Sequence, residues 1–173
     1  MKNLTFLTLT RRFLHFVAVN YGMAQIIIKG LRMSKHKIHK ILRFAAPKNT
    51  ILPPVIFVGL APKDSVVEGR YFLKNGREKC LLKIARAKYN HFPFKMTITS
   101  RERQQGYKSG FWLNNREEAL VFITSHELRH SYQAQHPYAR RHGWRKNMFS
   151  ESDADWYALK KLQEWRKIKN KRT

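Results

Sequence analysis

Two histidines four residues apart, His126 and His130, lie in a segment whose apolar residues follow a helical period. Residues at this spacing project from one face of a helix, so both rings can bind the same metal ion. Glu127 follows the first histidine and is placed to accept a proton from a metal-bound water molecule. This His-Glu-x-x-His string therefore requires a helix at this point and a fold that brings further ligands to it.

A helix is expected to begin near Asn114 or Asn115 and to carry the His-Glu-x-x-His string. Asn114 with Glu117 three residues later resembles a capping box, in which each residue bonds to the backbone of the other. Four apolar residues follow at helical spacing and predict a core face: Ala119, Leu120, Phe122 and Ile123.

A second helix is expected to begin at Ser150, with Asp153 in the matching capping position, and to end in the basic residues 166–172. Glu151 and Asp155 lie on one face of this helix, together with apolar residues further along it. We therefore expect this face to be buried. A buried carboxylate needs a partner, and a metal with its histidine ligands is a suitable one.

A catalytic zinc site usually needs a third protein ligand, for which Glu151, His136 and His142 are the candidates. His136 has the spacing of a third histidine in HExxHxxGxxH proteins, but these need a glycine midway so that the chain can turn. Gln133 occupies that position here and favours continuation of the helix. Glu151 is therefore the preferred third ligand.

The two segments together resemble the motif of gluzincin-type zinc metallopeptidases, in which HExxH precedes a helix carrying ExxxD, often ExxAD. This chain has His-Glu-Leu-Arg-His at 126–130 and Glu-Ser-Asp-Ala-Asp at 151–155. It looks most like small members of this group, often phage- or mobile-element-associated, and it is distantly similar to SprT-like zinc proteases. The resemblance covers residues 114 to 166, and no motif is matched before them.

The resemblance implies a zincin-like α+β fold, with a small antiparallel or mixed sheet followed by an active-site helix and a C-terminal ligand helix. It implies a zinc ion (Zn2+) bound by His126, His130 and Glu151. Asp155 then orients a ligand histidine, and Glu127 acts as general base in the hydrolysis of a protein or peptide substrate. The alternative, from another class, is a basic nucleic-acid-binding protein whose zinc site is structural or absent.

Two other parts of a peptidase site are less well specified. Tyr132, His136, His142 and Tyr157 are candidate donors to the developing oxyanion, and none is favoured by the sequence. An edge strand in the region of Lys79 to Ala87 is expected to bind an extended substrate by strand addition, by analogy of fold.

The residues before the two helices predict strands. Asn75-Gly76 between two apolar segments is a strong hairpin signal. The expected strands cover residues 55–60, 66–73, 79–87 and 94–99, and a polar loop is expected at 104–110.

The charge is unusual, because 35 Lys and Arg against 11 Asp and Glu give a net charge of +24. Such an excess indicates contact with a polyanion, most often nucleic acid and less often an anionic membrane surface; the competing interpretation is that the charge only maintains solubility. Residues 1–49 contain no acid and end near prolines, so we expect them to form a basic N-terminal arm with a short helix at 33–44. Residues 50–173 are then the zincin-like metallopeptidase domain.

A segment between the two C-terminal helices interleaves arginines with aromatic residues, which can contact phosphates and stack on bases. Its candidate nucleic-acid-binding residues are Arg140, Arg141, Trp144, Arg145 and Lys146. The competing interpretation is a charged loop whose tryptophan packs on the domain.

The single cysteine, Cys80, lies in an apolar run and is expected to be a buried hydrophobe in a reducing compartment. No apolar segment is long enough to span a membrane. We therefore expect a cytoplasmic protein, although the lack of acids before Asp64 also fits an organellar targeting segment.

Overall fold

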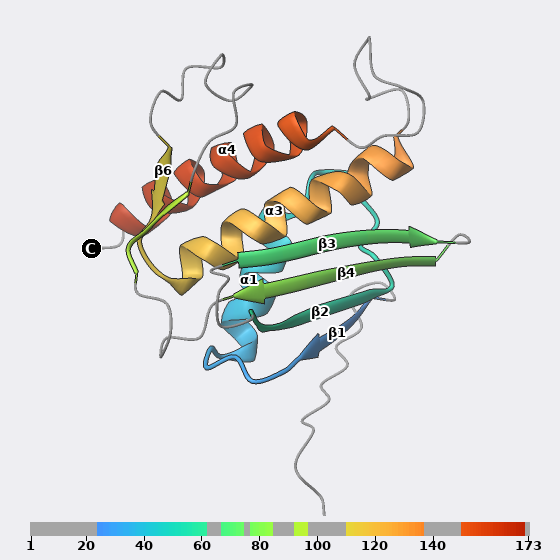
Figure 1. The fold of residues 1–173 in the computed structure, drawn as a ribbon, viewed down its shortest axis with the longest axis horizontal. Helices are drawn as coiled ribbons and strands as arrows, with labels where there is room; N and C mark the ends of the chain where they lie inside the picture. Colours follow the sequence, from blue (N-terminus) through green and yellow to red (C-terminus); the bar gives the residue numbers. More distant parts are fainter. Residues whose placement is uncertain are drawn as a thin grey trace, which may run out of the picture.

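The computed structural model describes residues 24–61, 67–74, 77–84, 92–96, 110–136 and 150–171. In this part of the chain, a mixed four-stranded sheet packs against helices, and a two-stranded sheet lies apart from it (Figure 1). The α+β class and the mixed sheet expected from the sequence are thereby confirmed.

The described residues form six strands and three helices. In chain order these are β1 (Gln25–Ile28), α1 (Lys35–Ala45), β2 (Val55–Leu60), β3 (Val67–Lys74), β4 (Arg77–Ile84), β5 (Phe94–Met96), β6 (Phe111–Leu113), α3 (Arg116–Gln135) and α4 (Glu151–Asn170). The larger sheet has the order β1-β2-β4-β3, with β1, β2 and β4 parallel and β3 antiparallel to β4. Strand β3 is therefore at an edge.

Strands β3 and β4 form the expected hairpin. Lys74 pairs with Arg77, and the register continues to Val67 opposite Ile84. The expected turn residues, Asn75 and Gly76, lie outside the described residues.

The N-terminal boundary expected at residue 49 is wrong for residues 24–49. Strand β1 pairs with β2 in the sheet, and α1 packs against α3. The buried face of α1 has helical spacing and consists of Ile38, His39, Ile41, Leu42 and Ala45. A basic segment can thus belong to the core, because its cations occupy the exposed side of the helix. Residues 1–23 lie outside the described part.

The strand expected at residues 94–99 is observed as β5, which pairs with the unexpected strand β6. Strand β6 has three residues, too few to show an alternating pattern. Residues 97–99 and most of the expected loop at 104–110 lie outside the described part.

Helix α3 lies between the sheet and α4, and α4 runs antiparallel to α3 (Figure 1). Because α3 is covered on several sides, it is buried over most of its circumference. The expected apolar stripe of α4 is buried at Ala158, Leu162 and Trp165. No helix in the described ranges has the length and apolar content required to cross a membrane.

Candidate metal centre

The N-terminus of each site helix is fixed by a side-chain cap. In α3 the cap is Asn115, whose Oδ1 accepts a hydrogen bond of 3.0 Å from the Glu118 amide. Glu118 in turn accepts from the backbone N–H of Asn114 at 2.8 Å. The expected pair of Asn114 and Glu117 is therefore wrong by one residue.

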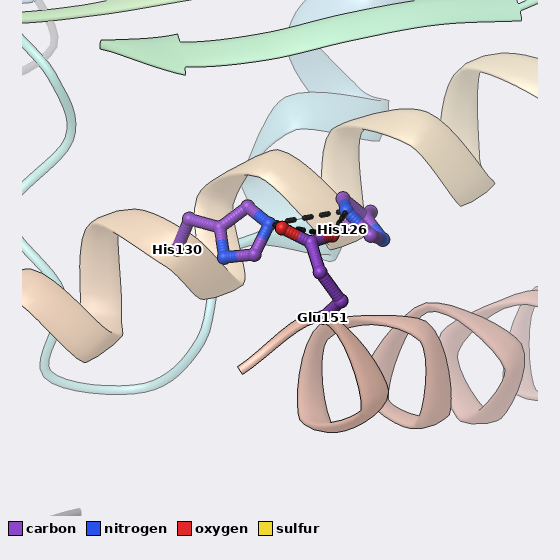
Figure 2. A group of neighbouring side chains, drawn as sticks. All are labelled: His126, His130 and Glu151. Carbon is purple, nitrogen blue, oxygen red and sulfur yellow. Dashed lines mark hydrogen bonds and ion pairs between the residues drawn. The ribbon is translucent and has the colours of Figure 1, made fainter. Parts of the chain in front are cut away.

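The cap of α4 is Ser150, as expected. Its hydroxyl accepts a hydrogen bond of 3.2 Å from the Asp153 amide. This cap starts α4 directly before Glu151, so that this carboxylate lies on the first turn and faces α3 (Figure 2).

Three candidate ligands converge between the helices, as Figure 2 shows. Nε2 of His126 lies 3.1 Å from Nε2 of His130 and 3.1 Å from Oε2 of Glu151. Nε2 of His130 lies 3.4 Å from the same oxygen. These residues form the only such group of metal-binding side chains among the residues the structure describes.

The three separations match the geometry of a tetrahedral zinc ion. With bonds of about 2.0–2.1 Å, two ligand atoms at tetrahedral corners are about 3.3–3.4 Å apart. Two imidazole nitrogens and a carboxylate oxygen this close also need a proton or a cation between them, because their lone pairs repel. The donor set of two histidines and one glutamate is one that zinc uses in catalytic sites.

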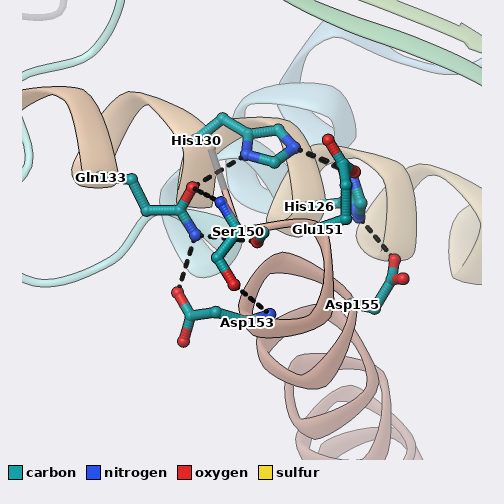
Figure 3. Close-up of polar contacts among 7 residues, drawn as sticks. All are labelled: His126, His130, Gln133, Ser150, Glu151, Asp153 and Asp155. Atoms are coloured by element: carbon teal, nitrogen blue, oxygen red, sulfur yellow. Dashed lines mark hydrogen bonds and ion pairs between the residues drawn. The ribbon is translucent and has the colours of Figure 1, made fainter. Parts of the chain in front are cut away.

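Asp155 contacts the other nitrogen of His126, with Oδ1 at 2.7 Å from Nδ1 (Figure 3). Burial lowers the pKa of His126, but the hydrogen bonds to Asp155 and Glu151 outweigh this effect and raise the pKa to about 10. In a metal site, the contact with Asp155 would instead fix the hydrogen on Nδ1 and leave Nε2 for the metal.

Glu127 lies against the edge strand β3. Its side chain is buried, with 4% of the residue exposed, and it accepts a hydrogen bond from the backbone N–H of Tyr71. Burial raises the pKa of Glu127, an effect opposed by His126 and His130. A raised pKa suits a carboxylate that takes up and returns a proton.

A cavity of about 270 Å³ brings Glu127 and the three candidate ligands together with one strand segment. That segment is Gly69–Phe72 of β3. The expectation of a substrate-binding edge strand at Lys79–Ala87 is therefore wrong, because β4 lies between β2 and β3. The edge strand beside the cavity is β3.

Gln133 connects His130 to the start of α4 (Figure 3). Its Oε1 accepts from Nδ1 of His130 at 3.0 Å and from the Ser150 amide at 3.1 Å. Its Nε2 donates to the Ser150 carbonyl and to Asp153, which also binds Arg129. The sequence pattern predicts only that Gln133 continues the helix. Its position three residues after His130 was the available signal for this contact.

The other candidate ligand and donors that the structure describes, His136, Tyr132 and Tyr157, lie outside the cluster. His136 caps α3, and its Nε2 lies 3.3 Å from the carbonyl oxygen of Asn49. The Tyr157 hydroxyl donates to the Ala45 carbonyl, and Tyr132 packs against His136 and Arg129. His142 and the expected nucleic-acid-binding residues at 140–146 lie outside the described part of the chain.

The expected burial of both carboxylates is wrong for one of them. The side chain of Glu151 is 72% exposed, against 20% for Asp155. The reason is its place on the first turn of α4, before the helix packs fully against α3.

Cys80 is fully buried as expected, and this burial raises the pKa of its thiol.

In comparisons with protein-family models, curated proteins and solved structures, no match to this chain was found.

Proposed function

We propose that this protein is a zinc-dependent metallopeptidase with a zincin-like arrangement of helices and sheet. The observation that carries the proposal is the convergence of His126, His130 and Glu151 in the cavity that also contains Glu127. The ligand separations of 3.1 to 3.4 Å fit one tetrahedral ion. Because three protein side chains take part, the fourth position of a tetrahedral ion is left for water or substrate.

Each residue then has a defined role. His126, His130 and Glu151 hold the zinc, and Asp155 and Gln133 keep the two rings oriented through their Nδ1 atoms. When bound, zinc supplies a Lewis acid that lowers the pKa of water and polarises a carbonyl group. Glu127 accepts the proton of the attacking water and later delivers it to the leaving amine.

Strand β3 supports peptides as the substrate class. It is an edge strand of the sheet and borders the cavity at Gly69–Phe72. An edge strand has backbone groups that are not paired within its sheet, and an extended peptide can bind to them as an additional strand. A peptide bound in this way lies across the proposed metal and Glu127.

Zinc stoichiometry and turnover of a generic unfolded protein such as casein test the proposal together. The wild-type protein is expected to bind one zinc and to cleave casein. His126→Ala and Glu151→Ala are expected to lose stoichiometric zinc and activity. Retention of stoichiometric zinc by both variants would overturn the site.

Glu127→Gln separates metal binding from chemistry. This variant is expected to keep its zinc, because Glu127 is not a ligand, and to lose turnover, because the amide cannot accept the proton. Glu164→Gln, which changes a carboxylate on α4 outside the cavity, is the control and is expected to retain both. If zinc is bound but the wild type cleaves nothing, the site is structural, and the peptidase proposal fails.

A further inference from the structure

A second groove, of about 570 Å³, lies between the C-terminal end of α1, helix α3 and helix α4. It shares no lining residue with the cavity that contains Glu127. Its walls combine cations with aromatic rings and include Lys48, Arg129, Tyr132, Trp156, Tyr157 and Lys160. Its volume is within the range of about 300–1,000 Å³ that is typical of small-ligand sites, so a nucleotide-sized group can enter it.

The cations of the groove are of two kinds. Arg129 is held by Asp153 through two hydrogen bonds, and Lys161 is paired with Glu164 at 2.9 Å. Lys48 and Lys160 are exposed, and neither forms an ion pair with any residue that the structure describes. The groove therefore offers two ammonium groups to an anionic ligand without breaking an ion pair between described residues.

The aromatic wall contains one exposed ring. Trp156 is 45% exposed, and the Lys160 ammonium lies 5.5 Å from its ring centroid. Tyr132 and Tyr157 are more buried, with the Arg129 guanidinium at 4.5 Å and 5.3 Å from their centroids. An exposed indole beside lysines can stack on a base while the ammonium groups contact the flanking phosphates.

We propose that this groove binds single-stranded nucleic acid, with a base on Trp156 and adjacent phosphates on Lys48 and Lys160. The net charge of +24 favours approach of any polyanion, and the concave aromatic site selects a ligand with accessible planar bases. A duplex keeps its bases stacked on one another and cannot offer them in this way.

An anionic membrane is a poorer fit to the same surface. Binding at a lipid interface needs a continuous exposed apolar face in addition to basic residues. Trp156 is the one large exposed hydrophobic residue among those that line the groove, within the described part of the chain. The groove proposal does not depend on zinc, since none of the proposed ligands lines it.

The aromatic contribution is tested with the full-length protein and fluorescently labelled oligothymidylate and oligouridylate. Trp156→Ala is expected to weaken binding of at least one strand about fivefold or more, the effect of losing one stacked base. The matched control is Trp112→Ala, which removes a tryptophan of similar exposure, 50%, that lies on β6 outside the groove. The control is expected to bind as the wild type, and the two oligonucleotides distinguish DNA from RNA.

The phosphate contacts are tested by the salt dependence of binding. A Lys48→Gln, Lys160→Gln double variant is expected to reduce the slope of log K against log salt by about 1.4, which is about 0.7 for each lost contact. A Lys79→Gln, Lys95→Gln double variant makes the same change in net charge at exposed positions on β4 and β5. It is expected to change the slope much less.

Three results would overturn the proposal. One is equal weakening by both lysine pairs, which would indicate general attraction by charge. Another is no loss with Trp156→Ala while its fold, checked by circular dichroism, is intact. The third is tighter binding to vesicles of anionic lipid, or to a duplex of equal length, than to either single strand. His126→Ala protein is expected to bind nucleic acid as the wild type does, so failure of the zinc site leaves this test unaffected.

Discussion

Gln133 accepts a hydrogen bond of 3.0 Å from Nδ1 of His130 through its Oε1 atom. The amide orientation is fixed, because Nε2 of Gln133 donates to Asp153 and to the Ser150 carbonyl. Nδ1 of His130 therefore carries the hydrogen, and Nε2 points its lone pair toward His126 and Glu151. The same side chain also holds Ser150, the residue before Glu151. One glutamine thus positions two of the three proposed ligands.

Gln133→Ala is expected to weaken zinc binding by about 10- to 100-fold, because His130 and α4 lose their common support. The variant also leaves polar groups without partners, so the free energy of unfolding is expected to fall by about 1–3 kcal/mol. Competition with a chromophoric chelator measures the affinity. The control is Gln135→Ala on the same helix, which removes hydrogen bonds to the Ile51 carbonyl and to the Ser131 hydroxyl. Equal zinc affinity in both variants would contradict the role of Gln133.

Gly69 allows β3 to approach the side chain of Glu127. A Cβ atom at this position would lie 2.2 Å from Oε1 of Glu127 and 2.5 Å from Cδ1 of Ile123. Both atoms are at the ends of flexible side chains, so Gly69→Ala is expected to fold with Glu127 displaced. Turnover is then expected to fall by about 100-fold, within the range of a lost general base, while stoichiometric zinc is retained.

The matched control for Gly69→Ala is Gly59→Ala, a glycine of the neighbouring part of the same sheet. A Cβ atom there meets only the Lys29 carbonyl oxygen, at 3.4 Å, which is an ordinary contact. The ratio of kcat between the two variants, at equal zinc content, is the deciding measurement. Similar kcat values would show that the close approach at Gly69 does not position Glu127.

The local signals in the sequence were sufficient for the helices of the candidate site. Ser150 caps α4 as expected, and the Asn-Gly pair identified the hairpin of β3 and β4. The position of the edge strand depends on strand order in the sheet, which local patterns do not contain. For the same reason the place of β1 in the sheet was missed, since its partner β2 lies about thirty residues later in the chain.

The contact between Asp155 and His126 is expected to increase zinc affinity through the charge of the carboxylate. Asp155→Asn keeps the shape of the side chain and removes the charge, so zinc binding is expected to weaken by about 10-fold or more. Glu164→Gln makes the same change of charge on α4, in a partly exposed pair with Lys161. Such pairs are worth about 0–1 kcal/mol, and this control is expected to leave zinc affinity unchanged. Equal effects of the two variants would indicate that only the net charge of α4 matters.

Glu118 joins the start of α3 to α4 and is expected to make stability depend on pH. It is buried and forms an ion pair with Arg166 while accepting from the backbone N–H of Asn114. Burial raises the pKa of Glu118, but the bonds to Arg166 and Asn114 outweigh this effect and hold the pKa below its ordinary value of 4.5. The folded state therefore favours the ionised carboxylate.

The sign of the effect follows from this lowered pKa. The stabilisation by Glu118 is complete above pH 4.5, the ordinary value, and is lost as the pH falls through the lower value of the folded state. Glu118→Gln is expected to reduce the free energy of unfolding by about 1–3 kcal/mol at neutral pH. The difference from the wild type should shrink as the pH falls below 4.5 and through the lowered pKa of the folded state, because the wild-type carboxylate then also becomes neutral. Urea denaturation across this range measures it, and a difference that stays constant with pH would show that the charge of Glu118 does not stabilise the helix pair.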